Sequence, residues 1–357
     1  MPMFERENYL RNARMQGPKW TPCRIVVSDA SWREHGCELR RIVLRHPTLF
    51  PGHTVKEGQT FRSPHQQIQC LDELFSDSWG CTWKRSVAGL EGIVIAHPLA
   101  DWQALAFYRP PDPLVQGDRG PANWAQVEQE LRATRSRGEV VSGGPPHGFF
   151  FLRLGYLRGF ENLMLDFATE SPVLPHLVDL VAAHNRLLVE KWLSLDIDVL
   201  ELADDLGSQR SSIVGPHVFH RWIRPHYEEL ARISHRTGAL VALHSDGYIM
   251  DLMDELLGAG IDIINPQDLV NGIDDLAREV KGRACIRLDI DRQAIVPYGT
   301  RSDIRELIEE EVRKLGSAAG GLEFVAGIYP PTTPDQVDAL AAALEEFCTY
   351  WWDGRGR

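Results

Sequence analysis

The feature that most constrains this chain is an alternation of short apolar runs and long amphipathic stretches, which begins near residue 139 and continues to the C-terminus. Most of the short runs are rich in β-branched, aliphatic or aromatic residues and often have Gly, Asn, Asp or Pro near one end, as strands do. The expected strands cover residues 140–141, 148–152, 198–202, 239–243, 262–264, 284–288 and 322–325.

The stretches between these runs have the periodicity of helices. In residues 174–193, apolar side chains and His184 recur at near-helical spacing on one face, and residues 303–315 repeat the pattern. Thr333 and Pro334 predict the start of a last helix that reaches about residue 351. Thr can cap a helix, and Pro fits the first helical position, where no N–H is needed.

Alternating strands and helices form parallel sheets with helical crossovers. With further strands at residues 24–27 and 93–96, about eight strand–helix units result, the number in a (β/α)8 TIM barrel. An open doubly wound sheet is the alternative, but no GxGxxG or GxxxxGK[ST] loop follows a strand. We predict one α/β barrel domain over residues 1–357, with an irregular N-terminal cap and the first strands in residues 1–110, and regular βα repeats in residues 139–350.

Charge and composition narrow the function. The 50 acidic residues against 38 basic ones, a formal net charge of −12, argue against a nucleic-acid-binding surface. No apolar run approaches the ~20 residues needed to span a membrane, and the charged N-terminus lacks a signal-peptide core. The six cysteines are scattered without a CxxC motif, as is typical of free thiols in a reducing compartment. We expect a cytoplasmic enzyme with small-molecule partners.

The N-terminal part is rich in tryptophan. Six of the ten tryptophans lie before residue 125, namely Trp20, Trp32, Trp79, Trp83, Trp102 and Trp124. They fit the packing of an irregular cap, and the alternative is an aromatic wall over a ligand pocket.

In a barrel, functional residues follow the carboxyl ends of the strands. The run 239–243 is followed by His244 and Asp246. Residues i and i+2 of an extended segment point the same way, so an imidazole and a carboxylate face one spot. The pair suits a divalent metal or an oriented acid/base pair, and the alternative is a His–Asp hydrogen bond that closes the loop.

Three carboxylates, Glu201, Asp204 and Asp205, surround the end of the run 198–202. Neighbouring carboxylates raise each other's pKa unless a cation or hydrogen-bond donors intervene. Asp205 with Glu201 or Asp204 could therefore complete a metal shell or hold a substrate amine. The alternative is that they cap the next helix.

Two further strand ends carry candidate residues. Asp289 and Asp291 follow the run 284–288, but they are flanked by arginines that can simply neutralise them. Tyr329 follows the last strand and offers a phenol at the barrel mouth, with core packing as the alternative. The chain has no Gly-x-Ser-x-Gly nucleophile elbow and no HExxH motif.

Several segments occur in a characteristic order. They are residues 157–164 (LRGFENLM), 204–208 (DDLGS), 225–227 (PHY), 243–247 (LHSDG), 260–266 (GIDIINP) and 327–334 (GIYPPTTP). Together they resemble the uroporphyrinogen decarboxylase superfamily, which also contains cobalamin-dependent methyltransferases. The resemblance covers roughly residues 140–350 and implies a (β/α)8 barrel.

The chain departs from both branches of that family. Decarboxylases carry an N-terminal Arg-Gln-Ala-Gly-Arg segment that grips the tetrapyrrole carboxylates, whereas residues 23–31 contain only Arg24, and they have a His where this chain has Ala326. A substrate with many carboxylates needs several cationic partners, so uroporphyrinogen is not the expected substrate. The methyltransferases bind zinc through His-x-Cys and a later Cys. Here Asp246 replaces the first Cys, and Ala326 or Gly327 replaces the second.

The resemblance implies methyl transfer between a small substrate and a corrinoid or similar carrier. We expect His244 and Asp246 to bind a divalent metal, with zinc as the first candidate. Asp205 and Tyr329 are the expected catalytic residues. The residues expected to contact substrate are Glu201, Asp204 and Asp289. No corrinoid-binding Asp-x-His-x-x-Gly is present, so a partner corrinoid protein would present the cobalamin. The alternatives are a decarboxylase or related lyase that uses Asp205 as its acid, and a non-catalytic ligand-binding barrel.

Overall fold

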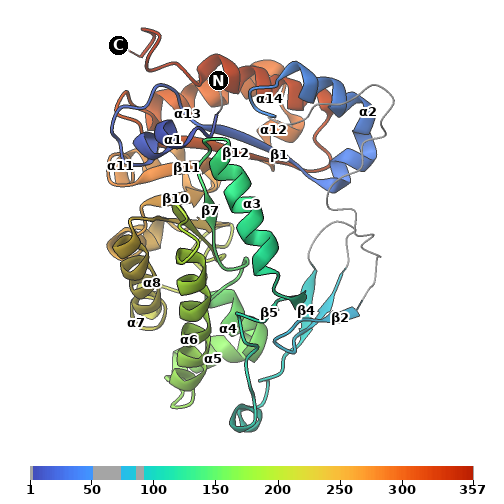
Figure 1. Ribbon diagram of the computed structural model, residues 1–357, viewed down its shortest axis with the longest axis vertical. Helices are drawn as coiled ribbons and strands as arrows, with labels where there is room; N and C mark the ends of the chain where they lie inside the picture. Colours follow the sequence, from blue (N-terminus) through green and yellow to red (C-terminus); the bar gives the residue numbers. More distant parts are fainter. Residues whose placement is uncertain (1–2, 51–73, 86–91, 357) are drawn as a thin grey trace. The chain divides into compact units, whose positions relative to one another are not determined.

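The computed structural model describes residues 3–50, 74–85 and 92–356 (Figure 1). The chain divides into two compact units. Unit 1 comprises Met1–Ile68, Gly138–Val140 and Asp262–Arg357, and unit 2 comprises Gln69–Arg137 and Val141–Ile261. Each unit has its own parallel strands and its own helices.

Unit 1 holds four parallel strands. They are β1 (Cys23–Val27), β10 (Ile263–Pro266), β11 (Cys285–Asp289) and β12 (Leu322–Ile328), in the spatial order β1, β12, β11, β10. Ile25 of β1 lies opposite Ala326 of β12, and Leu288 of β11 lies opposite Phe324 of β12. All four side chains are buried, as expected for parallel strands whose two faces are both covered.

The helices of unit 1 begin at local capping signals. They are α1 (Arg6–Ala13), α2 (Asp29–Arg45), α10 (Asp268–Asn271), α11 (Ile273–Glu279), α12 (Ile295–Tyr298), α13 (Arg301–Leu315) and α14 (Pro334–Phe347). Thr300 and Asp303 form a capping box at the start of α13, and Thr333 forms one with Gln336 at the start of α14. The expected start of the last helix is confirmed. Its end lies at Phe347, earlier than expected.

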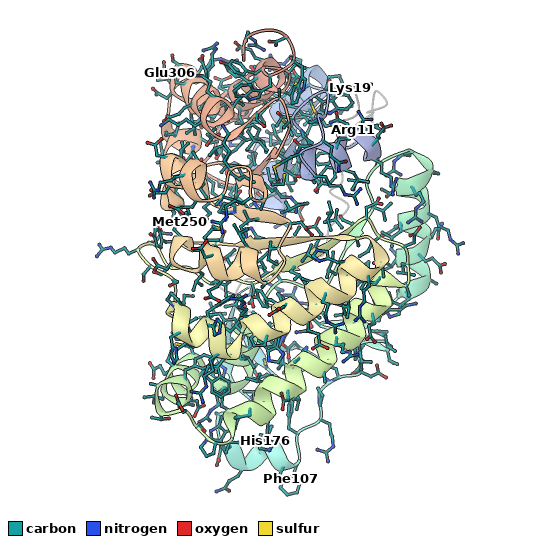
Figure 2. All side chains as sticks on the ribbon, turned by 90° about the vertical axis from the view of Figure 1, so that its left-hand side faces the viewer. Arg11, Lys19, Phe107, His176, Met250 and Glu306 are labelled. Atoms are coloured by element: carbon teal, nitrogen blue, oxygen red, sulfur yellow. The ribbon has the colours of Figure 1, made fainter. Side chains whose placement is uncertain are left out.

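Unit 2 holds three parallel strands and the remaining helices. The strands are β7 (Ser142–Gly143), β8 (Val199–Ala203) and β9 (Leu240–Ser245). The helices are η1 (Trp102–Ala106), α3 (Trp124–Ser136), α4 (Phe151–Arg158), α5 (Phe160–Thr169), α6 (Leu174–Leu193), α7 (Pro216–Trp222), α8 (Arg224–Thr237), η2 (Met250–Leu252) and α9 (Met253–Gly258). The chain leaves η1 at Phe107, which is 85% exposed and projects outward (Figure 2).

The strand faces of unit 2 decide which residues can reach a site. On β8, Leu200 and Leu202 are buried, whereas Glu201 and Ala203 are only half-buried. Successive side chains of a strand point to opposite faces, so Glu201 and Ala203 share the more open face. Ala203 lies opposite His244 of β9, and His244 is half-buried as well.

Two expected barrel strands are wrong, and a third, expected at residues 140–141, lies two residues later as β7. Residues 148–152 do not form a strand, because Gly148 turns the chain at φ +71° and Phe151 begins α4. Residues 93–96 do form a strand, β4 (Ile93–Ala96), but it pairs antiparallel with β3 (Thr82–Lys84). β3 follows β2 (Leu74–Ser76) along the chain and pairs antiparallel with it. The strands β2, β3 and β4 therefore form a separate small sheet.

The main prediction, an α/β fold of the (β/α)8 barrel type, is confirmed. Among the described residues, parallel strands alternate with helices, four strands in unit 1 and three in unit 2. A further two-stranded hairpin joins β5 (Gln116–Gly117) to β6 (Gly120–Pro121). Within the described ranges, no helix combines the length and the apolar character needed to cross a membrane.

Candidate metal site

The loops after β8 and β9 are held together by two glycines. A Cβ atom on Gly247 would lie 2.3 Å from the carbonyl carbon of Gly207, and one on Gly207 would lie 2.5 Å from that of Gly247. Gly247 also has φ +80°, a conformation that favours glycine. This backbone contact brings the residues before the two glycines together, and the Asp246 N–H donates to Asp205 Oδ1 at 3.1 Å.

The adjacent residues Asp204 and Asp205 face different surroundings. Asp204 is fully buried, and its carboxylate accepts hydrogen bonds from the N–H groups of Phe151 and Leu152 and from the Tyr227 hydroxyl, at 2.5, 2.9 and 2.8 Å. Burial raises the pKa of Asp204 to about 6, although these donors oppose the shift. The structure therefore places Asp204 at the N-terminus of α4, with its oxygens engaged inside the fold.

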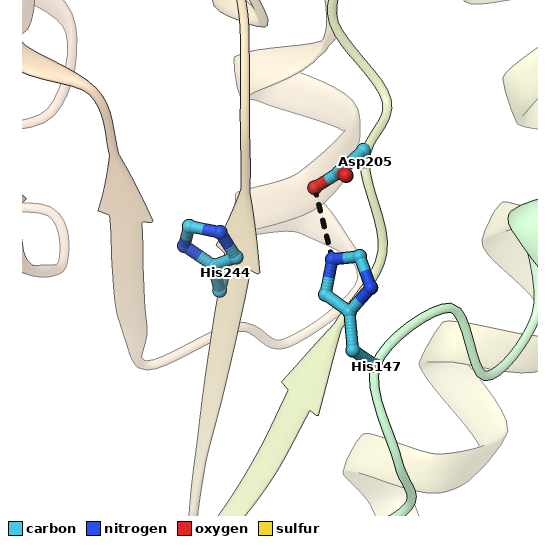
Figure 3. A group of neighbouring side chains, drawn as sticks. All are labelled: His147, Asp205 and His244. Carbon is cyan, nitrogen blue, oxygen red and sulfur yellow. Dashed lines mark hydrogen bonds and ion pairs between the residues drawn. The ribbon is translucent and has the colours of Figure 1, made fainter. Parts of the chain in front are cut away.

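Asp205 lies beside two imidazoles (Figure 3). His147, on the loop after β7, has its Nε2 atom 3.2 Å from Asp205 Oδ1. The rings of His147 and His244 are 6.2 Å apart between centroids. The ligand atoms of these three residues all lie within 4.8 Å of one another. Three successive parallel strands thus each deliver one side chain to the same place.

His244 and Asp246 also lie together, as the i, i+2 spacing predicts. His244 Nε2 is 3.4 Å from Asp246 Oδ1. The two side chains are 25% and 41% exposed, so neither is enclosed in the core. The pair can act as two ligands, or Asp246 can orient the imidazole of His244.

The electrostatics keep Asp205 ionised. Burial alone raises the pKa of Asp205, but the hydrogen bond from His147 and the charges of His147 and His244 outweigh it. The net result is a pKa below the ordinary value of an Asp carboxyl. At neutral pH Asp205 is therefore a carboxylate, which suits a ligand or proton acceptor and not a proton donor.

The donor set fits zinc. Catalytic zinc sites commonly have three protein ligands drawn from His and Asp or Glu, with the fourth position open. At Zn–N and Zn–O distances of about 2.0–2.1 Å, neighbouring ligand atoms in a tetrahedral shell lie about 3.4 Å apart. The 3.2 Å separation of His147 and Asp205 matches this spacing, and all three ligand atoms lie within 4.8 Å of one another.

The sequence also predicted Glu201, Asp289 and Tyr329 as site residues. Glu201 is on β8 opposite Ala242, before the loop that carries Asp205. In unit 1, Asp289 ends β11 with its side chain 6% exposed, and its Oδ2 atom lies 3.2 Å from the guanidinium of Arg292. The same guanidinium lies 5.8 Å from the ring centroid of Tyr329, which is 39% exposed. Arg292 therefore neutralises Asp289, as the flanking arginines suggested.

His147 is the residue of the cluster that the sequence pattern did not indicate. It follows Gly143, Gly144, Pro145 and Pro146, a turn with no metal-ligand spacing of its own. Its position after the expected strand 140–141 is the available signal, because the rule that selected His244 and Asp205 applies to that strand end as well.

The comparisons with known proteins agree with this fold. A family model described as uroporphyrinogen decarboxylase (URO-D) matches residues 91–347. A comparison with curated protein sequences gives no match. Among solved structures, a methyltransferase from Methanosarcina mazei is 16% identical, with a TM-score of 0.56 and coverage of 76% of this chain and 76% of that chain. At this identity the likeness supports the fold alone.

Two further solved structures are more distant. A B12-independent methionine synthase from Shewanella sp. W3-18-1 is 11% identical, with a TM-score of 0.40 and coverage of 65% of this chain and 70% of that one. A D-psicose 3-epimerase from Clostridium cellulolyticum H10 is also 11% identical, with a TM-score of 0.37 and coverage of 64% and 84%. Neither likeness bears on the reaction.

Proposed function

Because this chain belongs to the uroporphyrinogen decarboxylase family, we propose that it is a metal-dependent enzyme that transfers a methyl group between a small substrate and a corrinoid or similar carrier. The observation that carries the proposal is the cluster of His147, Asp205 and His244, whose ligand atoms lie within 4.8 Å of one another. Two imidazoles and a carboxylate form a donor set that zinc accepts.

The residues of the cluster have distinct roles in this proposal. His147, Asp205 and His244 hold the metal, which when bound supplies a Lewis acid that polarises a substrate oxygen or lowers the pKa of the accepting group. The Asp246 N–H fixes the orientation of Asp205 through its 3.1 Å hydrogen bond. The Asp246 carboxylate, 3.4 Å from His244 Nε2, orients that imidazole or serves as a fourth ligand.

The remaining candidate residues stay predictions. Tyr329 would donate a proton or orient the substrate, and Glu201 and Asp289 would contact it. Asp204 was expected to contact substrate as well, but its buried carboxylate holds the start of α4 instead. Tyr329→Phe tests the first role, because the phenol is lost while the ring is kept. The sequence has no corrinoid-binding Asp-x-His-x-x-Gly, so the carrier would be presented by a separate corrinoid protein.

Decarboxylation of another substrate is the second candidate function, and the family favours it. One observation counts against it, and a second counts against uroporphyrinogen as the substrate. The lowered pKa of Asp205 leaves the proposed acid without its proton at neutral pH. In unit 1, the guanidinium of Arg24 lies 4.3 Å from the centroid of the Phe4 ring. Arg24 is therefore packed on an aromatic face, and residues 23–31 hold no second arginine to grip a carboxylate-rich tetrapyrrole.

Metal analysis of the purified protein, followed by incubation with methylcobalamin and a panel of thiols, amines and alcohols, tests the proposal. We expect about one equivalent of zinc per chain and demethylation of methylcobalamin with at least one acceptor. Metal-free protein of full activity would contradict the metal site. Release of CO2 from a substrate without methyl transfer would favour the lyase, and ligand binding without any turnover would favour the binding barrel.

Asp246→Cys is a sharper variant, because it recreates the His-x-Cys pair of the methyltransferase branch. A thiolate is a softer ligand than a carboxylate, so we expect the preference for zinc over manganese or magnesium to increase. Asp246→Asn is the matched control, which keeps the size of the side chain and removes its charge. An unchanged metal preference in both variants would place Asp246 outside the metal shell.

A further inference from the structure

Unit 2 contains a second feature that the metal cluster does not use, an aromatic cavity of about 300 Å3. Its walls include Trp79, Trp124, Trp192 and Phe149. Two of the tryptophans from the N-terminal part of the chain thus form the aromatic wall that was the alternative to simple packing. An apolar cavity of about 150 Å3 holds one benzene molecule, so this cavity has room for a substituted single ring.

Two of the walls meet at a steep angle. The rings of Trp124 and Trp192 are 5.3 Å apart between centroids, with their planes at 76°. Gly143 leaves room for the Trp192 ring, since a Cβ atom on Gly143 would lie 2.4 Å from that ring. The negative faces of aromatic rings attract cations, and a corner of two indoles offers two such rings to one group.

The uncharged polar side chains of the wall offer acceptors. His184 uses its Nδ1 atom to bond the carbonyl oxygen of Pro111 at 3.1 Å, so Nδ1 carries the proton and Nε2 is an acceptor in the neutral ring. Burial lowers the pKa of His184 to about 4, which keeps the ring neutral at pH 7. Asn185 uses its Nδ2 atom to bond the carbonyl oxygen of Phe149 at 2.7 Å, which leaves its Oδ1 atom as an acceptor.

The charged residues that line the cavity are one carboxylate and one guanidinium, and the guanidinium is already paired. They are Asp118 and Arg153. The guanidinium of Arg153 donates to Asp77 at 3.1 Å and to Asp118 at 2.9 Å, so its charge is already compensated. An anion would therefore meet no unpaired cation among the lining residues, whereas the Asp118 carboxylate, which is 29% exposed, can receive a cation. Lys191 opposes such a cation, because its ammonium lies 5.3 Å from the Trp124 centroid, although it is not among the lining residues.

We propose that this cavity binds a compact organic cation, a substituted ammonium on an apolar body about the size of one ring. The ammonium lies among Asp118 and the acceptors of His184 and Asn185, and the apolar body packs against the corner that Trp124 and Trp192 form. Gly144, Pro146 and Phe149 line the cavity from the loop that also carries His147, so a bound ligand rests against this loop. The proposal does not depend on methyl transfer, because the experiment measures ligand binding and requires no turnover.

The test uses three probes that share one ring and differ in charge: benzylamine, benzyl alcohol and benzoate. Each is titrated by calorimetry into the full-length wild-type protein at pH 7.5. We expect benzylamine, which is protonated there, to bind about tenfold tighter than benzyl alcohol, and benzoate to bind weakest. Equal affinity for benzylamine and benzoate, or no binding of any probe at millimolar concentration, would overturn the proposal.

Three variants locate the effect in the cavity. Asp118→Asn keeps the shape but removes the charge, so benzylamine affinity falls about fivefold while benzyl alcohol affinity stays within about twofold. Lys191→Met removes the opposing ammonium and raises benzylamine affinity about twofold. Trp124→Leu weakens both probes, and Trp124→Phe restores most of the binding. If Asp118→Asn changes the affinity of the amine and the alcohol equally, in protein whose circular dichroism is unchanged, the cavity does not select a cation.

Discussion

The carboxylates after β8 and those after β11 arise from similar sequence patterns and end in opposite surroundings. Asp205 keeps its side chain 28% exposed beside two imidazoles. Asp291, two residues beyond the end of β11, is buried and its carboxylate accepts hydrogen bonds from successive backbone N–H groups at the start of α12. The donors are Gln293, Ala294, Ile295 and Val296.

The acids around Asp291 are buried, and their burial favours the protonated form. The Asp291 N–H donates to Asp268 at 2.8 Å, and Asp268 lies against Glu311, which is fully buried. Burial raises the pKa of both carboxyl groups, that of Glu311 well above its ordinary value. Asp291 thus cannot bind a ligand, because the N–H groups of its own loop already donate to its oxygens, whereas Asp205 has no such donor among the described residues of its own loop.

The largest expected effect is on metal binding. His147→Ala and His244→Ala should each lower zinc affinity by at least about 100-fold, because each removes one of three ligands. Isothermal titration with zinc measures the change. His220→Ala is the matched control, since His220 is 63% exposed and pairs with Glu255 away from the cluster. If His147→Ala keeps full zinc affinity, His147 is not a ligand. The metal would then be held by His244 and Asp246, the pair predicted from the sequence.

The steepness with which zinc affinity changes with pH depends on the number of imidazole ligands. Only neutral imidazole can bind a metal, and an ordinary imidazole titrates near pH ~6.5. Below that pH, affinity should fall about tenfold per pH unit for each imidazole ligand, so about 100-fold in the wild type and about tenfold in either His→Ala variant. The lowered pKa of Asp205 keeps its carboxylate charged over this range. A wild-type slope of tenfold would mean a single imidazole ligand.

Asp291→Ala and Asp205→Ala should separate stability from binding. Asp291→Ala leaves several N–H groups without their acceptor and should lower the free energy of unfolding by about 2–3 kcal/mol. Asp205→Ala should change it by less than about 1 kcal/mol and should abolish tight zinc binding. Urea denaturation and zinc titration of both variants measure the two effects. If Asp291→Ala loses zinc binding and Asp205→Ala keeps it, Asp291 is the metal ligand and Asp205 is not.

Glu311→Gln gives the smallest effect and tests the buried acids. The folded-state pKa of Glu311 is raised, so the unfolded chain releases this proton first and the stability of the wild type falls as pH rises above the ordinary Glu pKa. Gln cannot ionise. The variant should therefore gain on the order of 1 kcal/mol at pH 8 and differ little at pH 4. Equal effects at both pH values would mean that Glu311 is ionised in the folded protein.

Much of the fold follows from local pattern. Residues 174–193 and the pair Thr333 and Pro334 predicted α6 and the start of α14, because helical periodicity and capping act within a few residues. The strand prediction failed at residues 148–152, where apolar content is high but the buried Asp204 carboxylate accepts from the first N–H groups of a helix. That acceptor lies more than fifty residues away in the sequence, outside the reach of any local pattern.

The sequence by itself determined the class of fold, the family, and the pairing of His244 with Asp246, since an extended strand sends residues i and i+2 to one side. Only the tertiary structure decided that His147, 58 residues before Asp205, completes the cluster, and that Asp204 turns inward while Asp205 stays accessible. The register of β7, β8 and β9 and the contact of Gly207 with Gly247 set these outcomes. The physical reason is that both are long-range contacts, which form only when distant parts of the chain pack together.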